Sequence, residues 1–267
     1  MTDLPAVLSV PARLGVTGRL DGDRLVLVLE PRAEVLVHGM VRASVLAYAV
    51  DAVAGITVDR DRDTWTFTTD LSLRVRPLSA PRQVLAGAAV LRRGRRSVTC
   101  GVELTGDDGG PVGTAVIGFA HVPRRPGDPV KPDITPQRAV ALFSELPGLT
   151  RPVRDEAGIR VLDAAAGIVE VAVTPELQNP AGTLQGAMVA LVAEAAAEDL
   201  LSSLAGAPMA VTELDIRYLA QSGAGPVRTH SRLLGEGPDS PVEVGLVDTS
   251  TGTLTTLVYA RAVPVEA

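Results

Sequence analysis

Residues 179–201, NPAGTLQGAMVALVAEAAAEDLL, decide the fold of this chain. They open as a Pro/Gly loop and continue without a breaker through about eighteen residues rich in Ala, Leu, Val and Met, which predicts one long helix. Because this helix is apolar on nearly every side, we expect other elements to wrap around it. Glu194 is the one carboxylate inside its apolar run, ahead of Glu198 and Asp199 near the end of the helix. The first N–H groups of the helix, at Gln185 and Gly186, have no partner within it. An electropositive helix start combined with a buried acid predicts chemistry on a carbonyl group.

The same order of elements occurs twice in the chain. In the first half, a strand at residues 24–29 precedes a second apolar helix, which we expect to begin at His38 and Gly39. Antiparallel strands rich in β-branched residues follow each helix. The halves match best where TDLSLR, residues 69–74, aligns with TELDIR, residues 212–217. A repeat of this length predicts duplicated domains.

A segment rich in Pro and charge separates the two halves. Residues 121–136, HVPRRPGDPVKPDITP, lack any periodicity and are the natural linker. We expect an N-terminal domain over residues 1–122, a Pro-rich linker over 123–136 and a C-terminal domain over 137–267. Each domain is predicted to be a curved antiparallel β-sheet wrapped around a long central helix, which places the chain in the α+β class.

The composition narrows the class of protein. The chain has 267 residues, is 46% hydrophobic and carries a net charge of −6, which argues against nucleic acid or an anionic membrane as its partner. The single cysteine, Cys100, excludes an internal disulfide framework, and residues 1–4, MTDL, begin no export leader. No apolar run free of charge is long enough to span a membrane. We therefore expect a cytoplasmic protein.

The spaced motif, taken in its strand and helix context, resembles a known family. The motif has three parts: Asn-x5-(His/Gln)-Gly, an acid nine residues after the His/Gln, and a later strand that contains Thr. It resembles the motif of the hotdog-fold acyl-CoA thioesterases of the phenylacetate-pathway (PaaI-like) type. The match is closest over residues 179–196 and looser over residues 38–55. It takes in most of residues 15–265 and implies a double hotdog that hydrolyses a small or medium-chain acyl-CoA. Coenzyme A would then be part of the substrate, and we expect no metal or other cofactor.

The resemblance implies roles for the matching residues. Asn179 would position the thioester or the attacking water, and the N–H of Gly186 would bind the thioester carbonyl. Glu194 would act as nucleophile or general base. Gln185 stands where the family more often has His, which is not required if the backbone N–H polarises the carbonyl.

A pair of hydroxyl residues also matches between the halves. By the resemblance Thr212 would assist the acid or its water, and Thr69 occupies the corresponding position in the first half. Thr is common in strands on propensity alone, so the matched positions carry this assignment.

Helix geometry requires that each site draw on both halves. Gly186 and Glu194 are eight residues apart, roughly 12 Å along the helix, so one carbonyl cannot touch both. The acid must therefore come from the other helix. We expect the helix start at His38 and Gly39 to face Glu194, and the start at Gln185 and Gly186 to face an acid of the first helix.

The acid of the first helix has two alignments. Aligning the halves at His38 and Gly39 matches Ala47 with Glu194. Aligning them backwards from Thr69 and Thr212 matches Asp51 with Glu194 instead, and this requires four extra residues between His38 and Asp51. Both alternatives stay open at this point. The first half also lacks the Asn, so each site is incomplete in a different place, and Glu194 is favoured as the better acid because its spacing fits the family directly.

Two rival functions stay open beside hydrolysis. A hotdog dehydratase or hydratase would use His38 facing Glu194 as a dyad, although the motif stretches of those enzymes are missing. A non-catalytic acyl-CoA-binding protein would account for the incompleteness of both sites. An exposed sheet edge favours a homo-oligomer, a dimer or trimer of double hotdogs.

Overall fold

The computed structural model describes residues 9–59, 61–77, 79–131, 133–143 and 146–265. Residues 1–4, in which the sequence predicts no export leader, and residue 132 of the predicted linker lie outside the described residues. No helix within the described ranges is both long enough and apolar enough to cross a membrane.

The two repeats have the same order of elements, a hairpin, a long helix and four strands. In the first repeat these are β1 (Val16–Asp21), β2 (Arg24–Leu29), α1 (Ala43–Val58), β5 (Thr64–Val75), β6 (Val84–Arg93), β7 (Ser97–Gly106) and β8 (Pro111–Pro123). In the second they are β9 (Arg160–Asp163), β10 (Ile168–Val171), α4 (Gly186–Ala205), β11 (Met209–Tyr218), β12 (Val227–Leu233), β13 (Val242–Asp248) and β14 (Thr253–Pro264). The smaller elements are β3 (Leu36–Val37), β4 (Met40–Val41), α2 (Pro136–Phe143) and α3 (Val153–Glu156), with 3-10 turns at Pro11–Arg13, Ala33–Val35 and Pro175–Leu177.

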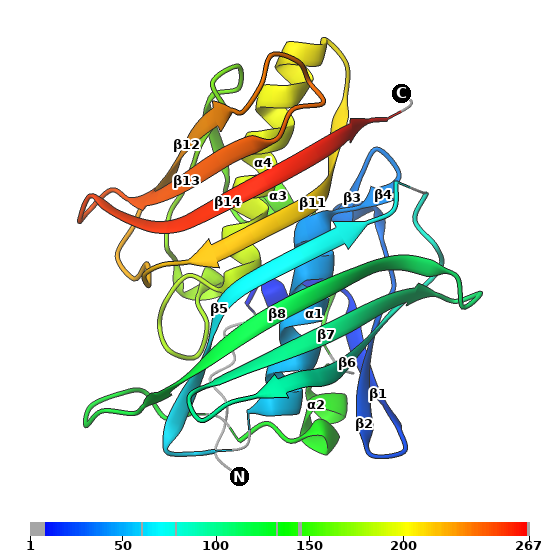
Figure 1. Ribbon diagram of the computed structural model, residues 1–267, viewed down its shortest axis with the longest axis vertical. Coiled ribbons are helices and arrows are strands. Elements are labelled where there is room, and N and C mark those ends of the chain that lie inside the picture. The colour runs from blue at the N-terminus through cyan, green and yellow to red at the C-terminus, as the bar shows by residue number, and fades with distance from the viewer. Residues whose placement is uncertain (1–8, 60, 78, 132, 144–145, 266–267) are drawn as a thin grey trace.

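Both repeats contribute to one continuous antiparallel sheet. Its twelve described strands run in the order β1-β2-β6-β7-β8-β5-β11-β14-β13-β12-β10-β9, so β5 and β11 join the repeats at its middle (Figure 1). At this junction Leu71 lies opposite Ile216 and Leu73 opposite Leu214, and all four side chains are buried. The repeats therefore share a core instead of packing as separate units.

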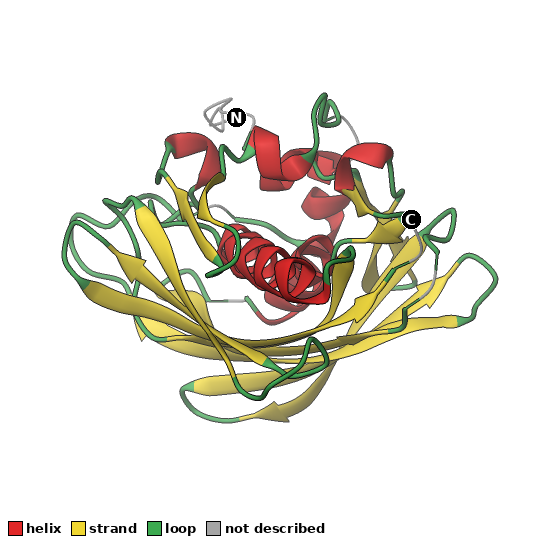
Figure 2. Cartoon of the chain, turned by 90° about the horizontal axis from the view of Figure 1, so that it is seen from above, coloured by secondary structure: helices red, strands yellow, loops and turns green. Residues whose placement is uncertain are grey.

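The helices lie together inside the curve of the sheet. Seen from above, the sheet bends around α1 and α4, and both helices lie on its inner side (Figure 2). Most residues of both helices are buried, including every position of α4 from Ala187 to Ala197. A helix that is apolar all round needs such an enclosure, so the predicted α+β class, with curved antiparallel sheet wrapped around central helices, is confirmed. The sheets of the two repeats are joined into one.

A bulge at the same position of each repeat confirms the alignment of the strands. The pairing of β5 with β8 shifts register between Thr68 and Asp70, and the pairing of β11 with β14 shifts between Val211 and Glu213. The residues that bulge are Thr69 and Thr212, the pair that the sequence aligns. A bulge re-aims the neighbouring side chains of a strand, and this decides below which threonine reaches the acid.

The first long helix begins later than predicted. His38 and Gly39 form the exposed turn between β3 and β4, with φ of 47° and 78°, and α1 starts at Ala43 with Arg42 as its N-cap. The expectation that α1 begins at His38 and Gly39 is therefore wrong. The four residues from His38 to Val41 belong to the hairpin, and Asp51 follows Arg42 by nine residues. Asp51 is thus the counterpart of Glu194, and Ala47 is not.

The segment between the repeats is held against the first repeat. Its described residues from Arg124 to Thr135 form neither helix nor strand, and the indole of Trp65 donates a hydrogen bond to Asp128. The helix that follows, α2, packs on β1, where the missing side chain of Gly18 lets the backbone of Val140 approach closely. The domain boundaries themselves stay a prediction.

Candidate active site

The N-terminus of α4 keeps one donor available. The N–H of Ala187 donates to the side-chain oxygen of Gln185 at 2.6 Å. The N–H groups of Met188 and Val189 donate to the backbone carbonyl of Gln185 at 2.9 and 3.0 Å. That of Gly186 has no acceptor among the residues that the structure describes. The absent side chain also matters, because a Cβ at Gly186 would stand 3.2 Å from the Tyr218 hydroxyl, which donates to the Gly186 carbonyl. Gly186 therefore offers a free N–H at an electropositive helix end.

Asp51 of α1 faces this helix start from the other repeat. The Gln185 amide lies 3.4 Å from Asp51 Oδ2, and the Thr68 hydroxyl donates to Asp51 Oδ1 at 2.6 Å. The three side chains come from α1, β5 and the N-cap of α4. The site is therefore shared between the repeats, as the helix geometry requires.

Burial sets the electrostatics of this cluster. Desolvation raises the pKa of Asp51, while the hydrogen bond from Thr68 opposes the rise. Burial, and then the nearby charge of Asp51, also raise the pKa values of Tyr48 and Tyr218, which keeps both phenols neutral. A carboxylate with a raised pKa is a stronger proton acceptor than an ordinary carboxylate, which suits Asp51 to the role of a general base.

A cavity of about 560 Å³ opens at Asp51, Thr68, Gln185 and Gly186. Most of the aromatic side chains that line it come from α1, β5 and the segment that ends in α2, and we call this its apolar side. This side includes Ala52, Gly55, Ile56, Trp65, Phe67, Ile134 and Phe143, together with the polar Asp59, Thr66 and Lys131. The amide side chains come from the loops next to α4 and β11, which with nearby hydroxyls form its polar side. This side includes Gln178, Asn179, Thr183, Gln221, Ser222, Thr255 and Thr256, together with the apolar Leu184, Leu219 and Ala220. The volume is in the range of small-molecule sites.

Asn179 and Thr69 line the cavity but do not contact the acid. The side-chain oxygen of Asn179 accepts the N–H groups of Ala181 and Thr183 at 3.0 and 3.2 Å, which holds the loop before α4. The Thr69 hydroxyl donates to Asp70 at 2.8 Å, and Thr69 is the residue that bulges from β5. Its neighbour Thr68 bonds to the acid instead.

At the N-terminus of α1, a carboxylate occupies the donors. Glu194 is fully buried and accepts the N–H of Ala43 at 2.7 Å, the N–H of Ser44 at 3.5 Å and the Ser44 hydroxyl. Arg42 lies 3.7 Å from Glu194 and 2.8 Å from Glu198. Burial and the charge of Glu198 raise the pKa of Glu194 to about 7, against the opposing effects of Arg42 and the hydrogen bonds.

Glu194 therefore caps α1, and it does not contact His38 and Gly39, the partners that the sequence predicts. The donors that face it come from Ala43 and Ser44, not from His38 and Gly39, so the His38–Glu194 dyad of the dehydratase hypothesis does not form. Thr212 is buried at its bulge in β11, and the residue that corresponds to Thr68 is the apolar Val211.

Comparison with known proteins identifies the architecture. No protein-family model matches the chain, and no curated protein matches it. The 12:0-ACP thioesterase from Umbellularia californica is similar at 13% identity with a TM-score of 0.60, over 92% of this chain and 99% of that one. The tesB protein of Mycobacterium avium subs paratuberculosis is similar at 12% identity with a TM-score of 0.63, over 96% of this chain and 98% of that one. A protein with a hot dog fold from Alicyclobacillus acidocaldarius is similar at 12% identity with a TM-score of 0.63, over 98% of this chain and 100% of that one. This chain is a double hotdog.

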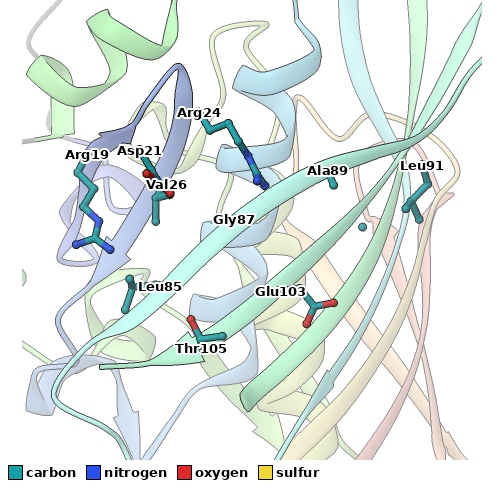
Figure 3. Close-up of a pocket in the computed structure, with 11 residues that line it drawn as sticks. Arg19, Asp21, Arg24, Val26, Leu85, Gly87, Ala89, Leu91, Glu103 and Thr105 are labelled. Atoms are coloured by element: carbon teal, nitrogen blue, oxygen red, sulfur yellow. The ribbon is translucent and has the colours of Figure 1, made fainter. Parts of the chain in front are cut away.

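The double hotdog also has a groove on the outer face of its sheet. Side chains alternate between the faces of a strand, so Leu85, Gly87 and Ala89 of β6 face away from the helices while Val84, Ala86 and Ala88 are buried beneath them. The groove, about 350 Å³ in volume, carries charges of both signs, as Figure 3 shows for Arg19, Asp21, Arg24 and Glu103. Among the described residues, neither this groove nor the inner cavity is lined by Glu194 or Arg42.

Three residues of the inner site are not singled out by the sequence. Thr68 lies in a run of threonines, and only the bulge at Thr69 distinguishes it from its neighbours. Tyr48 precedes Asp51 by three residues, which places both on one face of a helix, so this signal was available. Tyr218 comes from the far end of β11, and no local pattern connects it to Gly186.

Proposed function

We propose that this double hotdog hydrolyses acyl thioesters, with Asp51 as the general base. The observation that carries the proposal is the position of Asp51, which lies in a cavity opposite the start of α4, where the Gly186 N–H is unpaired among the residues that the structure describes. Thioesterases among the structures of similar fold are consistent with this reaction. The acid assigned here is Asp51, whereas the sequence favours Glu194.

The reaction follows from the available groups. The thioester carbonyl accepts the Gly186 N–H, where the helix dipole stabilises the negative charge that develops on its oxygen. Asp51 takes a proton from water as the water oxygen attacks the carbonyl carbon. The C–S bond then breaks, the thiolate leaves, and the proton held by Asp51 passes to the sulfur. Gln185 and Thr68 hold the carboxylate in place for both transfers.

The hydrogen bonds divide the roles between two kinds of residue. Asp51 and Gly186 would contact the reacting atoms, and Asn179 would position the loop that leads into α4. Loss of one donor to a developing oxyanion lowers kcat by about 10²–10³, and loss of a general base lowers it by about 10²–10⁴.

The finer predictions from the sequence are carried over unchanged. They are an acyl-CoA substrate, the phenylacetate-pathway subtype, a cytoplasmic location and association into two or three chains. What supports association is that no described strand pairs with the outer edges of β1 and β9, and that every residue of β9 is exposed. Sedimentation analysis of the purified chain measures the number of subunits.

Release of free thiol from acyl-CoA esters tests the proposal. The panel runs from acetyl through dodecanoyl and includes phenylacetyl, and it compares the wild type with Asp51→Ala. Turnover in the wild type that falls at least about 10²-fold in Asp51→Ala supports hydrolysis at this site. If the wild type releases no thiol above background but binds the esters, the chain is an acyl-CoA-binding protein and the proposal is wrong.

A further inference from the structure

One face of α1 continues the cavity beyond Asp51. Ala52, Gly55, Ile56 and Asp59 all line it, and spacings of three or four residues place them on one side of the helix. Trp65 and Phe67 of β5, Ile134 of the segment between the repeats and Phe143 of α2 form the opposite wall. The result is an apolar channel that leads away from the reacting centre.

Lys131 closes the far end of this channel. Its side chain is only 8% exposed, and its ammonium lies 2.5 Å from Asp59, 2.6 Å from the Asp61 carbonyl and 2.7 Å from the Thr64 carbonyl. The Thr66 hydroxyl also donates to Asp59 at 2.6 Å. An ammonium has three donors, and all three are used. Lys131 is therefore a fixed wall and has no donor left for a charged group of a ligand.

The two sides of the cavity suit the two halves of a thioester. The polar side offers the amides of Gln178 and Gln221 and the hydroxyls of Ser222 and Thr256, which fit the amide groups of a carrier arm. The channel along α1 offers apolar walls and a closed end. Because transfer of hydrocarbon from water into an apolar channel is favourable, the acyl chain belongs in the channel.

We propose that the Lys131–Asp59 pair limits the acyl chain to medium length. Asp51 and Asp59 are eight residues apart, about 12 Å along the helix. Carbon–carbon bonds of about 1.52 Å advance an extended chain by roughly 1.25 Å per carbon, so the channel holds about eight to ten carbons. The proposal rests on the proposed function for its substrate, and it assigns the length limit to the segment that joins the repeats.

Two matched double variants separate volume from charge at the closed end. Lys131→Ala with Asp59→Ala removes both side chains, and because Lys has a four-carbon stem, the preferred acyl length should increase by about two to four carbons. Lys131→Met with Asp59→Asn removes both charges but keeps the volume, so its optimum is expected at the wild-type length whatever its rate. Gly55→Leu fills the channel one turn after Asp51 and should shift the optimum to shorter chains.

The experiment reads length preference in two independent ways. The kcat/KM values for acetyl-CoA through hexadecanoyl-CoA give the profile of turnover, and calorimetric affinities for free fatty acids of the same lengths give the profile of binding. An optimum at about eight to ten carbons that shifts as stated in both profiles supports the proposal.

The outcomes that contradict it are distinct. Turnover with a flat profile, or with an optimum that stays fixed in Lys131→Ala with Asp59→Ala and in Gly55→Leu, overturns the length limit and leaves hydrolysis standing. Length-dependent binding that shifts without any turnover overturns hydrolysis and leaves the limit standing. Absence of both turnover and length dependence overturns both proposals.

Discussion

The two long helices begin in the same way but face different acids. At the start of α4, Asp51 contacts the Gln185 side chain, and the Gly186 N–H has no acceptor within the described part of the chain. At the start of α1, Glu194 bonds directly to the N–H of Ala43, the residue that corresponds to Gly186. Both acids follow the N-cap of their own helix by nine residues. The two sites therefore share a backbone arrangement and differ in their side chains.

The length of the acid accounts for much of this difference. Glu has one methylene more than Asp, so Glu194 reaches the helix start opposite and satisfies its donors, whereas Asp51 stops at Gln185 and Thr68. The N-cap residues of the two helices also differ, in charge. Arg42 adds a cation to the buried acids Glu194 and Glu198, and Gln185 is neutral. The Glu194 site is part of the core, and the Asp51 site opens into a cavity.

The first prediction converts the open site into the closed one. Asp51→Glu lengthens the acid by one methylene, so its carboxylate should reach the Gly186 N–H and occupy the donor of the oxyanion. We expect kcat for acyl-CoA hydrolysis to fall about 10²–10³-fold, the cost of losing one such donor. Steady-state kinetics measure the effect. Glu194→Asp is the matched control and should keep the wild-type kcat; equal kcat in Asp51→Glu and the wild type would show that acid length does not close the site.

The second prediction removes the cap of α1. Glu194→Ala leaves the N–H of Ala43 and the hydroxyl of Ser44 without their acceptor and opens a cavity in the core. Loss of a buried, hydrogen-bonded charge should lower the free energy of unfolding by about 3 kcal/mol. Urea denaturation measures it, with Glu236→Ala on the surface as the control. A change below about 0.5 kcal/mol, the range of ordinary surface substitutions, would mean that Glu194 does not hold the helix start.

The third prediction concerns pH. The pKa of Glu194 rises from 4.5 to about 7 on folding, so between these values the folded chain binds more protons than the unfolded chain. Stability should therefore decrease as the pH rises from 4.5 to 7, by about 1–3 kcal/mol from this group. Denaturation at pH 5 and pH 8 measures the change. In Glu194→Gln it should be smaller by that amount, and the same pH dependence in both proteins would assign it to other groups.

The fourth and smallest prediction tests the support of Asp51. Thr68→Val removes a hydrogen bond that lowers the pKa of Asp51, so that pKa should rise further. The acidic limb of the kcat/KM profile should then move to higher pH by about one unit, the size expected for a hydrogen bond worth roughly 1.4 kcal/mol. Thr212→Val, at the matching bulge of the second repeat, should leave the limb in place. An unmoved limb in Thr68→Val would exclude Thr68 as the residue that sets this pKa.

Much of the architecture is predictable from the sequence, because it depends on patterns that extend over many residues. The apolar helix at residues 186–205, the repeat and the antiparallel strands all follow from composition and alternation. The start of α1 was misplaced for a physical reason. The hairpin of Leu36–Val37 and Met40–Val41 is as apolar as the helix behind it, so composition does not show where strand ends and helix begins. The partner strands β1 and β9 also went unpredicted, although Gly22 marks a turn between β1 and β2.

The site is less predictable than the fold, because it depends on single side chains. The sequence requires an acid from the opposite repeat, and the structure shows Asp51 opposite Gln185 and Gly186. Whether a carboxylate reaches the N–H groups of the opposite helix depends on the length of its side chain, Asp or Glu. The spacing of residues along the sequence does not describe this difference. A bulge of one residue likewise exchanges Thr69 for Thr68 as the partner of Asp51.

Turnover of the two isosteric amide variants, Asp51→Asn and Glu194→Gln, tests the central claim most directly. Each replaces one carboxylate by an amide of the same shape, so the comparison isolates the charge and the proton acceptor. The account predicts that Asp51→Asn lowers kcat for acyl-CoA hydrolysis about 10²–10⁴-fold while Glu194→Gln stays within a few-fold of the wild type. The reverse result, with turnover lost in Glu194→Gln and kept in Asp51→Asn, would contradict it and assign catalysis to the start of α1.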